Sequence, residues 1–429
     1  MVESHPKAAS ATLAERTLPP KERLAVLLAA FAGLFCDGFE LGLMPVASLS
    51  VSQSLLGPAY TDTLGGAWFA WFTAALMLGA AIGGIVLGDL GDCLGRARGM
   101  AISILCYSVF SGLGSLVRTQ EQMLVLRFLV GLGAGGMWPN GVALVAECWP
   151  NRSRVLISGV VGAGINAGYL LLALLVWTWP VTPAAWRWLF SWAAVPAIIG
   201  IASWFWLPES PKWLASRHAR KPVSPPVREL WRGPLRRTTL VGIALGAIPL
   251  IGAWAASKWM VPWADKVGGA AQPHYKAITT LCWAMGATLG SFLGAPVAGL
   301  LGRRLAYFLI SLGATALTCA LFSFTAPLRT TFLPVVCVQG FVATLFFGWL
   351  PLYLPELFPT RVRAAGSGLA YNSGRFATAV GVLFAGTLFA ALGGSYSRVG
   401  ATTGLIYALG MLAICFAPDT SRKSLEEDL

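Results

Sequence analysis

Long apolar segments alternate with short polar connections along almost the whole chain. Each apolar segment is about 20 residues or longer, the length that a helix needs to cross the hydrocarbon core of a bilayer. They fall at residues 24–50, 63–88, 99–117, 122–146, 155–178, 186–207, 238–262, 276–301, 305–326, 331–355, 364–391 and 397–417. Strands of a membrane barrel are excluded because they would be short and alternating, whereas residues 240–250 are apolar on every side. The pattern predicts an all-α integral membrane protein with twelve transmembrane helices.

The composition excludes a soluble globular protein. Hydrophobic residues make up 56% of the 429 residues, and charged residues make up only 11%, whereas a soluble globular protein carries about 25% charged residues. The eight cysteines form no C-x-x-C pair. We therefore expect them to pack within the membrane, and we expect no metal site, disulfide framework or cofactor.

Two stretches about half a chain apart have nearly the same sequence. Residues 147–154 and 356–363 both read E-x-x-P-x-R-x-R, and each closes one apolar segment and precedes the next. Gly-Arg pairs at 95–96 and 302–303 keep nearly the same offset. Many secondary transporters arise from such a duplication and place a central site between two halves that can rock. The repeat therefore predicts two pseudo-symmetric six-helix bundles.

These patterns divide the chain into five parts. They are an N-terminal tail at 1–21, a first bundle at 22–207, a linker at 208–237, a second bundle at 238–417 and a C-terminal tail at 418–429. The linker is rich in Pro, Arg and Ser, as a cytoplasmic connection would be. No signal peptide is visible in residues 1–20. We expect the protein to be a monomer.

Basic residues gather on alternate connections, among them 96–98, 152–154 and 212–237. By the positive-inside rule, both termini are predicted to be cytoplasmic in a multi-pass protein of the plasma (inner) membrane. The net charge of +13 is then a topological signal and a contact with the anionic lipid bilayer. A nucleic-acid partner is not expected, because the chain lacks a single basic face with interleaved aromatic residues.

The connection after the second apolar segment points to a family. Residues 88–98 read G-D-L-G-D-C-L-G-R-A-R and resemble the signature loop of the major facilitator superfamily, commonly G-x-x-x-D-R-x-G-R-[RK]. The loop departs from that pattern at Cys93, where the family has a basic residue. The second-half copy has Gly299 where an acid would match Asp92. The contact by which this loop holds the two halves together at the cytoplasmic side is therefore expected to be weaker in the second half.

Three further segments strengthen the resemblance. Residues 127–136 are similar to the R-x-x-x-G-x-G-x-G motif of the superfamily, and residues 208–214 are similar to the P-E-S-P-[RK]-[WF]-L of sugar porters and organic-ion carriers. Residues 37–40, D-G-F-E, match the D-G-[FY]-[DE] pattern of the metabolite and aromatic-acid proton symporters. The resemblance implies the twelve-helix transporter fold over the whole chain.

The resemblance also implies a function. We expect a secondary active transporter that moves a small organic solute, namely an organic anion or carboxylate, by alternating access coupled to protons. A proton-coupled multidrug exporter is an alternative, but residues 158–168 lack the proline that exporters often carry in span 5. A sugar carrier or an uncoupled organic-ion facilitator is another. An enzyme is not expected, because no H-E-x-x-H motif and no histidine lies in an apolar segment.

Charged residues inside the apolar segments are candidates for function, because each costs at least about 2.5 to 3.5 kcal/mol at mid-membrane. They are Asp37, Glu40, Arg127, Lys258 and Arg375. Asp37 is predicted to be the proton-coupling carboxylate, with Glu40 as the second candidate and Arg127 as the cation that Asp37 meets in one state. The alternative is that Asp37 caps a helix break near Gly38 or makes a permanent ion pair.

Arg375 is the candidate for binding an anionic substrate, because a guanidinium presents a planar fork to a carboxylate. The alternative is that Arg375 pairs with an acid such as Asp37. Aromatic and amide side chains are expected to complete the pocket. They are Trp138, Asn140, Asn166, Tyr169, Trp254, Gln339, Trp349, Tyr371 and Asn372.

The repeated polar motifs are predicted to act in gating. Their charged residues sit at the predicted cytoplasmic edge, where ion pairs can change partners as the halves rock. The gating candidates are Asp92, Arg96, Arg98, Glu147, Arg154, Arg303, Arg304, Glu356 and Arg363.

Overall fold

The computed structural model describes residues 18–149, 154–211, 213–214, 227–359 and 362–420. Within these ranges it contains helices, turns and loops and no strand. Twelve helical spans are long and apolar enough to cross a membrane. The predicted fold class, including the number of spans, is therefore confirmed.

Six of the spans precede the linker and six follow it. The first half contains α2 (Pro20–Leu56), α3 (Asp62–Leu94), α4 (Arg96–Leu113), α5 (Gln120–Cys148), α6 (Arg154–Thr178), and α7 (Arg187–Trp192) with α8 (Ala197–Trp206) as one span. The second half contains α10 (Gly233–Ile251) continuing into α11 (Met260–Gly268), α12 (Tyr275–Leu301), α13 (Arg303–Phe324), α14 (Phe332–Glu356), α15 (Arg363–Ala391), and α16 (Tyr396–Gly404) with α17 (Ala408–Cys415).

The two halves repeat the same close helix packing. In the first half α3 crosses α5 at glycines, and a Cβ on Gly131 would collide with the backbone carbonyl of Leu76. In the second half α12 crosses α14 in the same way, and a Cβ on Gly286 would collide with the carbonyl of Cys337. Small residues allow membrane helices to approach this closely. The second and fourth spans of each half thus form equivalent pairs, as a duplication predicts.

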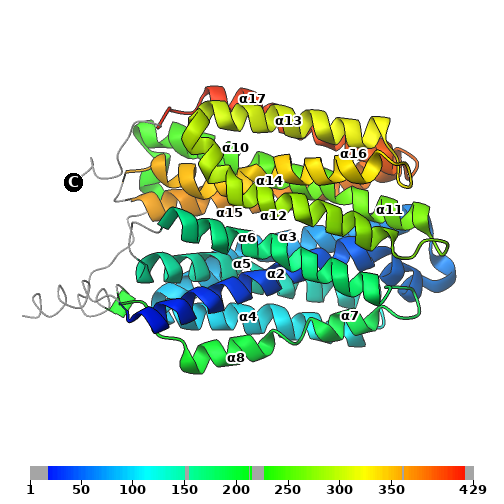
Figure 1. Cartoon of the computed structure of the whole chain (residues 1–429), viewed down its shortest axis with the longest axis horizontal. Helices are drawn as coiled ribbons and strands as arrows, with labels where there is room; N and C mark the ends of the chain where they lie inside the picture. The colour runs from blue at the N-terminus through cyan, green and yellow to red at the C-terminus, as the bar shows by residue number, and fades with distance from the viewer. Residues whose placement is uncertain (1–17, 150–153, 212, 215–226, 360–361, 421–429) are drawn as a thin grey trace, which may run out of the picture.

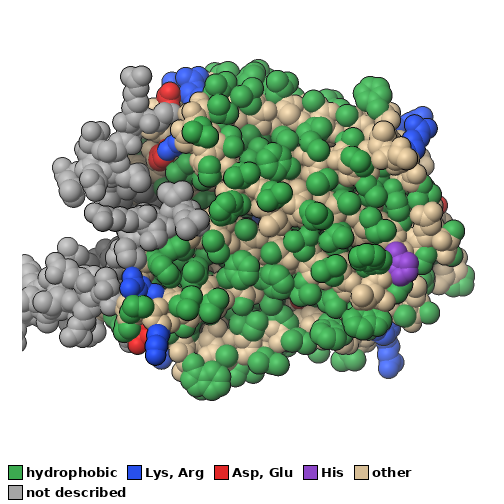
Figure 2. All heavy atoms as spheres, in the orientation of Figure 1, with side chains coloured by type: hydrophobic (Ala, Val, Ile, Leu, Met, Phe, Trp, Pro, Cys, Tyr) green, Lys and Arg blue, Asp and Glu red, His purple; other side chains and the backbone are tan. Residues whose placement is uncertain are grey.

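The flank of the molecule is apolar and its two ends carry the charges. Figure 2 shows hydrophobic side chains over the length of the helices, with Lys, Arg, Asp and Glu gathered at the ends. Large hydrophobic residues in the middle of the spans are exposed, for example Leu289 on α12 at 60% and Val380 on α15 at 67%. A soluble monomer rarely exposes so much apolar surface. The distribution fits a protein whose flank faces lipid.

Both described ends of the chain lie at the left end of the bundle in Figure 1, which we call the terminal end; the opposite end is the far end. At the far end the halves are joined, since Lys266 on α11 pairs with Asp62 on α3 at 3.0 Å. Lys276 on α12 donates to the carbonyl of Val181 at 2.8 Å. Trp259 packs against Phe69 on α3, with ring centroids 5.1 Å apart. The boundary between the halves is therefore closed at the far end.

Candidate substrate and proton site

Asp37 lies in the middle of α2 and is buried, with 2% of its surface exposed. Helix α2 runs unbroken from Pro20 to Leu56, so Asp37 caps no helix break. Its Oδ1 atom is buried without a hydrogen-bond partner among the described residues, which also give it no ion pair. The neighbouring Gly38 packs so closely on α6 that a Cβ would collide with the carbonyl of Ile165. Asp37 therefore faces the protein interior as an unpaired carboxyl group.

Glu40, one turn farther along α2, belongs to a buried network with α4 and α5. The hydroxyl of Ser111 donates to Glu40 Oε2 at 2.5 Å, and Arg127 Nη2 donates to Ser111 at 3.0 Å. Arg127 Nη1 lies 3.9 Å from Glu40 Oε2, and both side chains are fully buried. Arg127 was expected to meet Asp37, but in this state its acidic partner is Glu40.

Arg375 extends from α15 across the boundary between the halves. Its Nη1 donates to the backbone carbonyls of Ala80 on α3 at 3.1 Å and Gly135 on α5 at 3.3 Å. No ion pair with Asp37 is formed in the described part of the chain. A guanidinium that binds only carbonyl oxygens keeps donors available for a carboxylate.

Three other predicted pocket residues lie beside Arg375. The guanidinium carbon is 5.2 Å from the ring centroid of Tyr371, and Tyr371 stacks on Trp138 of α5 at 6.3 Å. Asn372 approaches Gly84 of α3 so closely that a Cβ there would touch its Oδ1 at 2.5 Å. These residues form one group where α3, α5 and α15 meet, which we call the arginine group.

A second group spans the boundary on another side, where α6 meets α12. Asn166 Nδ2 donates to Ser291 Oγ at 2.6 Å, and Tyr169 packs edge to face on Trp283 with centroids 5.3 Å apart. Trp254 is linked to this group through Lys258, whose ammonium nitrogen lies near the rings of both Trp254 and Tyr169. Trp283 was not among the predicted pocket residues, because a tryptophan in an apolar segment looks the same in sequence whether it faces lipid or a site.

Three of the predicted pocket residues are fully buried within their own half. Asn140 donates to the carbonyls of Leu87 and Gly136, each at 2.9 Å. Gln339 donates to Ser257 Oγ at 2.6 Å, and Trp349 donates to the carbonyl of Arg303 at 2.9 Å. In this state Asn140, Gln339 and Trp349 hold neighbouring segments of their own half together.

The first-half gating residues bind one another at the terminal end. Arg96 pairs with Asp92 one turn earlier and lies 3.5 Å from Glu147. The backbone N–H of Ala97 donates to Glu209 at 3.2 Å. Burial raises the pKa of the Glu209 carboxyl despite these backbone donors. The segment that resembles P-E-S-P is thus docked on the signature loop.

The second-half gating residues form a matching cluster. Arg303 binds Glu356 through two nitrogens, at 2.9 Å and 3.1 Å, and Arg304 donates to the carbonyl of Cys415. Arg98 of the first half is the one other predicted gating arginine whose side chain is described. It lies 5.8 Å from the ring centroid of Trp204, which is also in the first half. The side chains of Arg154 and Arg363 lie outside the described set. Among the described residues, each ion pair at the terminal end stays within one half.

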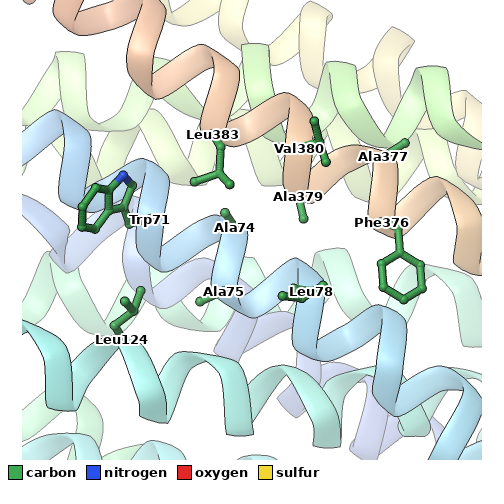
Figure 3. A pocket seen from close by; sticks show the side chains of 10 residues that line it. All are labelled: Trp71, Ala74, Ala75, Leu78, Leu124, Phe376, Ala377, Ala379, Val380 and Leu383. Carbon is green, nitrogen blue, oxygen red and sulfur yellow. The ribbon is translucent and has the colours of Figure 1, made fainter.

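An apolar crevice of about 490 Å³ lies on the flank between α3 and α15 (Figure 3). Its walls carry no charged side chain, and the Trp71 indole nitrogen is the one polar side-chain atom in the lining. Since Trp71 and Val380 are also exposed on the flank, this crevice offers nothing that would bind an anion.

Known relatives are membrane transporters. The chain is 29% identical over 408 residues to the probable 4-methylmuconolactone transporter of Cupriavidus pinatubonensis, covering 93% of this chain and 91% of the relative. It is 31% identical over 380 residues to the cis,cis-muconate transport protein of Acinetobacter baylyi, covering 86% and 87%. It is 27% identical over 404 residues to the gallate transporter of Pseudomonas putida, covering 85% of each.

Solved structures share the fold. A crystal structure of a D-xylose-proton symporter superposes with a TM-score of 0.72 at 17% identity, covering 94% of this chain and 99% of the symporter. A partially occluded inward-open xylose transporter of Escherichia coli gives a TM-score of 0.73 at 18% identity, covering 94% and 100%.

The family model described as "Sugar (and other) transporter" matches residues 25–224 and again residues 217–427. These two matches include almost the whole chain, and each contains one of the six-helix halves. The chain therefore belongs to the sugar (and other) transporter family of the major facilitator superfamily, whose members are transporters and not enzymes.

Proposed function

We propose that this protein is a proton-coupled symporter of small organic carboxylates that works by alternating access. One observation carries the substrate class: Arg375 reaches across the boundary between the halves, and its hydrogen-bond acceptors among the described residues are backbone carbonyls. A substrate carboxylate would replace those carbonyls with a bidentate, charge-assisted contact. The named transport of muconate and gallate by relatives supports the same class of substrate.

Asp37 carries the proton in this proposal. It is a buried carboxyl group whose Oδ1 has no hydrogen-bond partner in the described ranges of the chain, and a proton on it removes an unpaired charge from the interior. Glu40 is less suited to this role in the present state, because Ser111 and Arg127 already bind it. Asp37 can exchange protons with the terminal end when the halves separate there.

The proposal assigns a direction to the observed state. If the terminal end is cytoplasmic, as the distribution of Lys and Arg predicts, the far end is external, and the observed state is closed to the outside. Reopening the far end would break the pair between Lys266 and Asp62. Closing the terminal end would bring the clusters around Glu147 and Glu356 together, where they can exchange arginine partners. We also propose a monomeric protein of the inner membrane.

Uptake by proteoliposomes tests the proposal. Purified protein should accumulate labelled cis,cis-muconate or gallate when the outside is acidic, and a protonophore should abolish the accumulation. Arg375→Gln should raise the substrate concentration at half-maximal uptake by about tenfold or more, because a charge-assisted pair is lost. Arg375→Lys should show a smaller increase, because lysine keeps the charge but not the planar fork. Uptake that ignores the pH gradient would refute proton coupling, and unchanged affinity in Arg375→Gln would refute its role in recognition.

A further inference from the structure

Lys258 is a cation buried inside the seventh span. It is 4% exposed, and the part of the chain that the structure describes gives it neither an ion pair nor a hydrogen bond. Its ammonium nitrogen lies 3.4 Å from the ring centroid of Trp283, 4.0 Å from that of Tyr169 and 5.6 Å from that of Trp254. We call Lys258 and these three rings the lysine cage.

The rings offset only part of the cost of burying this charge. A desolvated cation–π contact contributes about 2 kcal/mol, whereas an ion removed from water loses several kcal/mol. Ring faces also leave the N–H groups of the ammonium without oxygen acceptors. The cage therefore has a positive charge to be balanced.

Two of the cage residues have unused donors of their own. The hydroxyl of Tyr169 and the indole Nε1 of Trp283 are both buried, and neither has a hydrogen-bond partner among the residues whose positions are described. Buried polar groups are normally satisfied, so each exception needs an explanation. Ammonium, hydroxyl and indole N–H together are three kinds of donor gathered without an acceptor, which is the chemistry of a carboxylate site.

The cage occurs where the seventh span is irregular. After α10, a π-helical turn at Gly252–Ala256 leads into a 3₁₀ turn at Ser257–Trp259, which contains Lys258. Gln339 stabilises this irregular segment by donating to Ser257. Such π-helical turns are frequent at functional sites. Ordinary helical packing would have no need for such a turn here.

The cage also lies on the boundary between the halves. Tyr169 is on α6 of the first half, whereas Trp283 is on α12 of the second. Trp259, the residue after Lys258, belongs to the aromatic contacts that close the far end. The cage is therefore a place where substrate binding and the movement of the halves meet.

We propose that Lys258, Tyr169 and Trp283 form a second carboxylate subsite, separate from the arginine group, and that the preferred substrate is a planar unsaturated dicarboxylic acid. This inference rests on the proposed function. One carboxylate binds Arg375 and the other binds Lys258, and the aromatic rings cover the planar body. A carboxylate arriving from the terminal end exchanges the ring faces around the ammonium for its own oxygen atoms.

Charge balance supports a dicarboxylate. Arg127 and Glu40 neutralise each other, which leaves Arg375, Lys258 and Asp37 as the interior charges without an ion pair among the residues that the structure describes. When Asp37 carries a proton, the two remaining cations match two carboxylates. A dianion together with one proton on Asp37 thus leaves this interior neutral. A monocarboxylate would leave one cation unmatched in that protonation state, and would be balanced only if Asp37 stayed ionised and carried no proton.

A matched pair of ligands tests the subsite. Hexa-2,4-dienedioate (muconate) and hexa-2,4-dienoate (sorbate) share the same six-carbon diene and differ by one carboxylate. Binding to the full-length protein in nanodiscs, in chloride-free buffer, should favour muconate by about tenfold or more. Lys258→Gln should remove this preference: the Kd for muconate should rise about tenfold or more, while the Kd for sorbate should stay within about threefold of the parent value.

Further variants separate charge from packing. Lys258→Arg should retain most of the muconate preference, and Tyr169→Phe and Trp283→Phe, which keep a ring but lose a donor, should each weaken muconate by roughly three- to tenfold. Retained sorbate binding shows that each variant is folded. Equal loss of both ligands in Lys258→Gln would make the lysine a structural residue and would overturn the subsite.

The remaining outcomes distinguish the two proposals. If the parent protein binds both acids equally and Lys258→Gln changes neither, the subsite fails while organic-acid transport stands. If the parent protein binds neither acid, nor gallate, both proposals fail. If muconate preference disappears when chloride is restored, the cage is an adventitious site for small anions, and the assignment to a dicarboxylate is overturned.

Discussion

Arg127 and Lys258 are both cations buried in membrane-spanning helices, yet they are stabilised in different ways. Arg127 has an acid and a hydroxyl around it, from Glu40 and Ser111. Lys258 has aromatic rings. The Arg127 network lies wholly within the first half, on α2, α4 and α5, whereas the rings of the lysine cage come from both halves.

This difference separates a permanent pair from a replaceable one. A pair within one rigid half need not break when the halves rock, so its two charges can balance each other in every state. A cation on the boundary meets different surroundings in each state, and an acid fixed there would hold the halves together. Leaving Lys258 without an acid thus leaves the balancing charge to be supplied by cargo.

The largest expected effect is on Arg127. Arg127→Met strands Glu40 as a buried, uncompensated charge and should destabilise the protein by about 3 to 5 kcal/mol, measured as a loss of unfolding free energy in detergent. The double variant Arg127→Met with Glu40→Gln should recover much of this loss, because no charge is then left unpaired. If the single variant is as stable as the parent, Arg127 and Glu40 are not a structural pair.

A smaller effect is expected at Ser111, which bridges the pair. Ser111→Ala removes the donor to Glu40 and the acceptor for Arg127, and should cost about 1 to 3 kcal/mol. Ser108→Ala is a matched control on the same helix, since the Ser108 hydroxyl binds only the carbonyl of Ile104 four residues earlier. Equal losses in the two alanine variants would show that the bridge contributes nothing special.

Lys258→Met should behave in the opposite way. It removes a buried charge that has no acid partner, so the unfolding free energy should stay within about 1 kcal/mol of the parent or rise. The loss of the cation–π contacts destabilises this variant, whereas the removal of the cost of burying a charge stabilises it. A loss as large as that of Arg127→Met would mean that a protein group neutralises Lys258, and the contrast between the two cations would disappear.

Sequence alone predicted the fold well, because the signals for it are local. Each apolar segment predicts one membrane span by its length and composition. A charged residue inside such a segment can be recognised without knowing which residue it pairs with. Asp37, Glu40, Arg127, Lys258 and Arg375 were therefore recognised as interior charges before their surroundings were known, and the structure buries the first four almost completely.

Their partners could not be predicted, because they come from helices far apart in the chain. Glu40 is selected over Asp37 as the partner of Arg127 by Ser111 on a third helix. The cage around Lys258 combines rings from α6 and α12. Arg375 binds backbone carbonyls, which every residue possesses and which no sequence pattern distinguishes.

The smallest expected effect extends the contrast to the terminal end. Glu147 now contacts Arg96 within its own half, and we expect it to gain a partner from the other half when that end closes. The two side chains are partly exposed, at 20% and 24%, and a surface pair contributes about 0 to 1 kcal/mol. Glu147→Gln should therefore leave binding intact and change only the populations of the two states. Labelling of single cysteines placed at the two ends of the bundle measures this shift. Glu121→Gln, at the far end of α5, is the control and should leave the labelling unchanged. A Glu147→Gln labelling pattern identical to that of the parent would mean that this carboxylate serves only its own half, as Glu40 does.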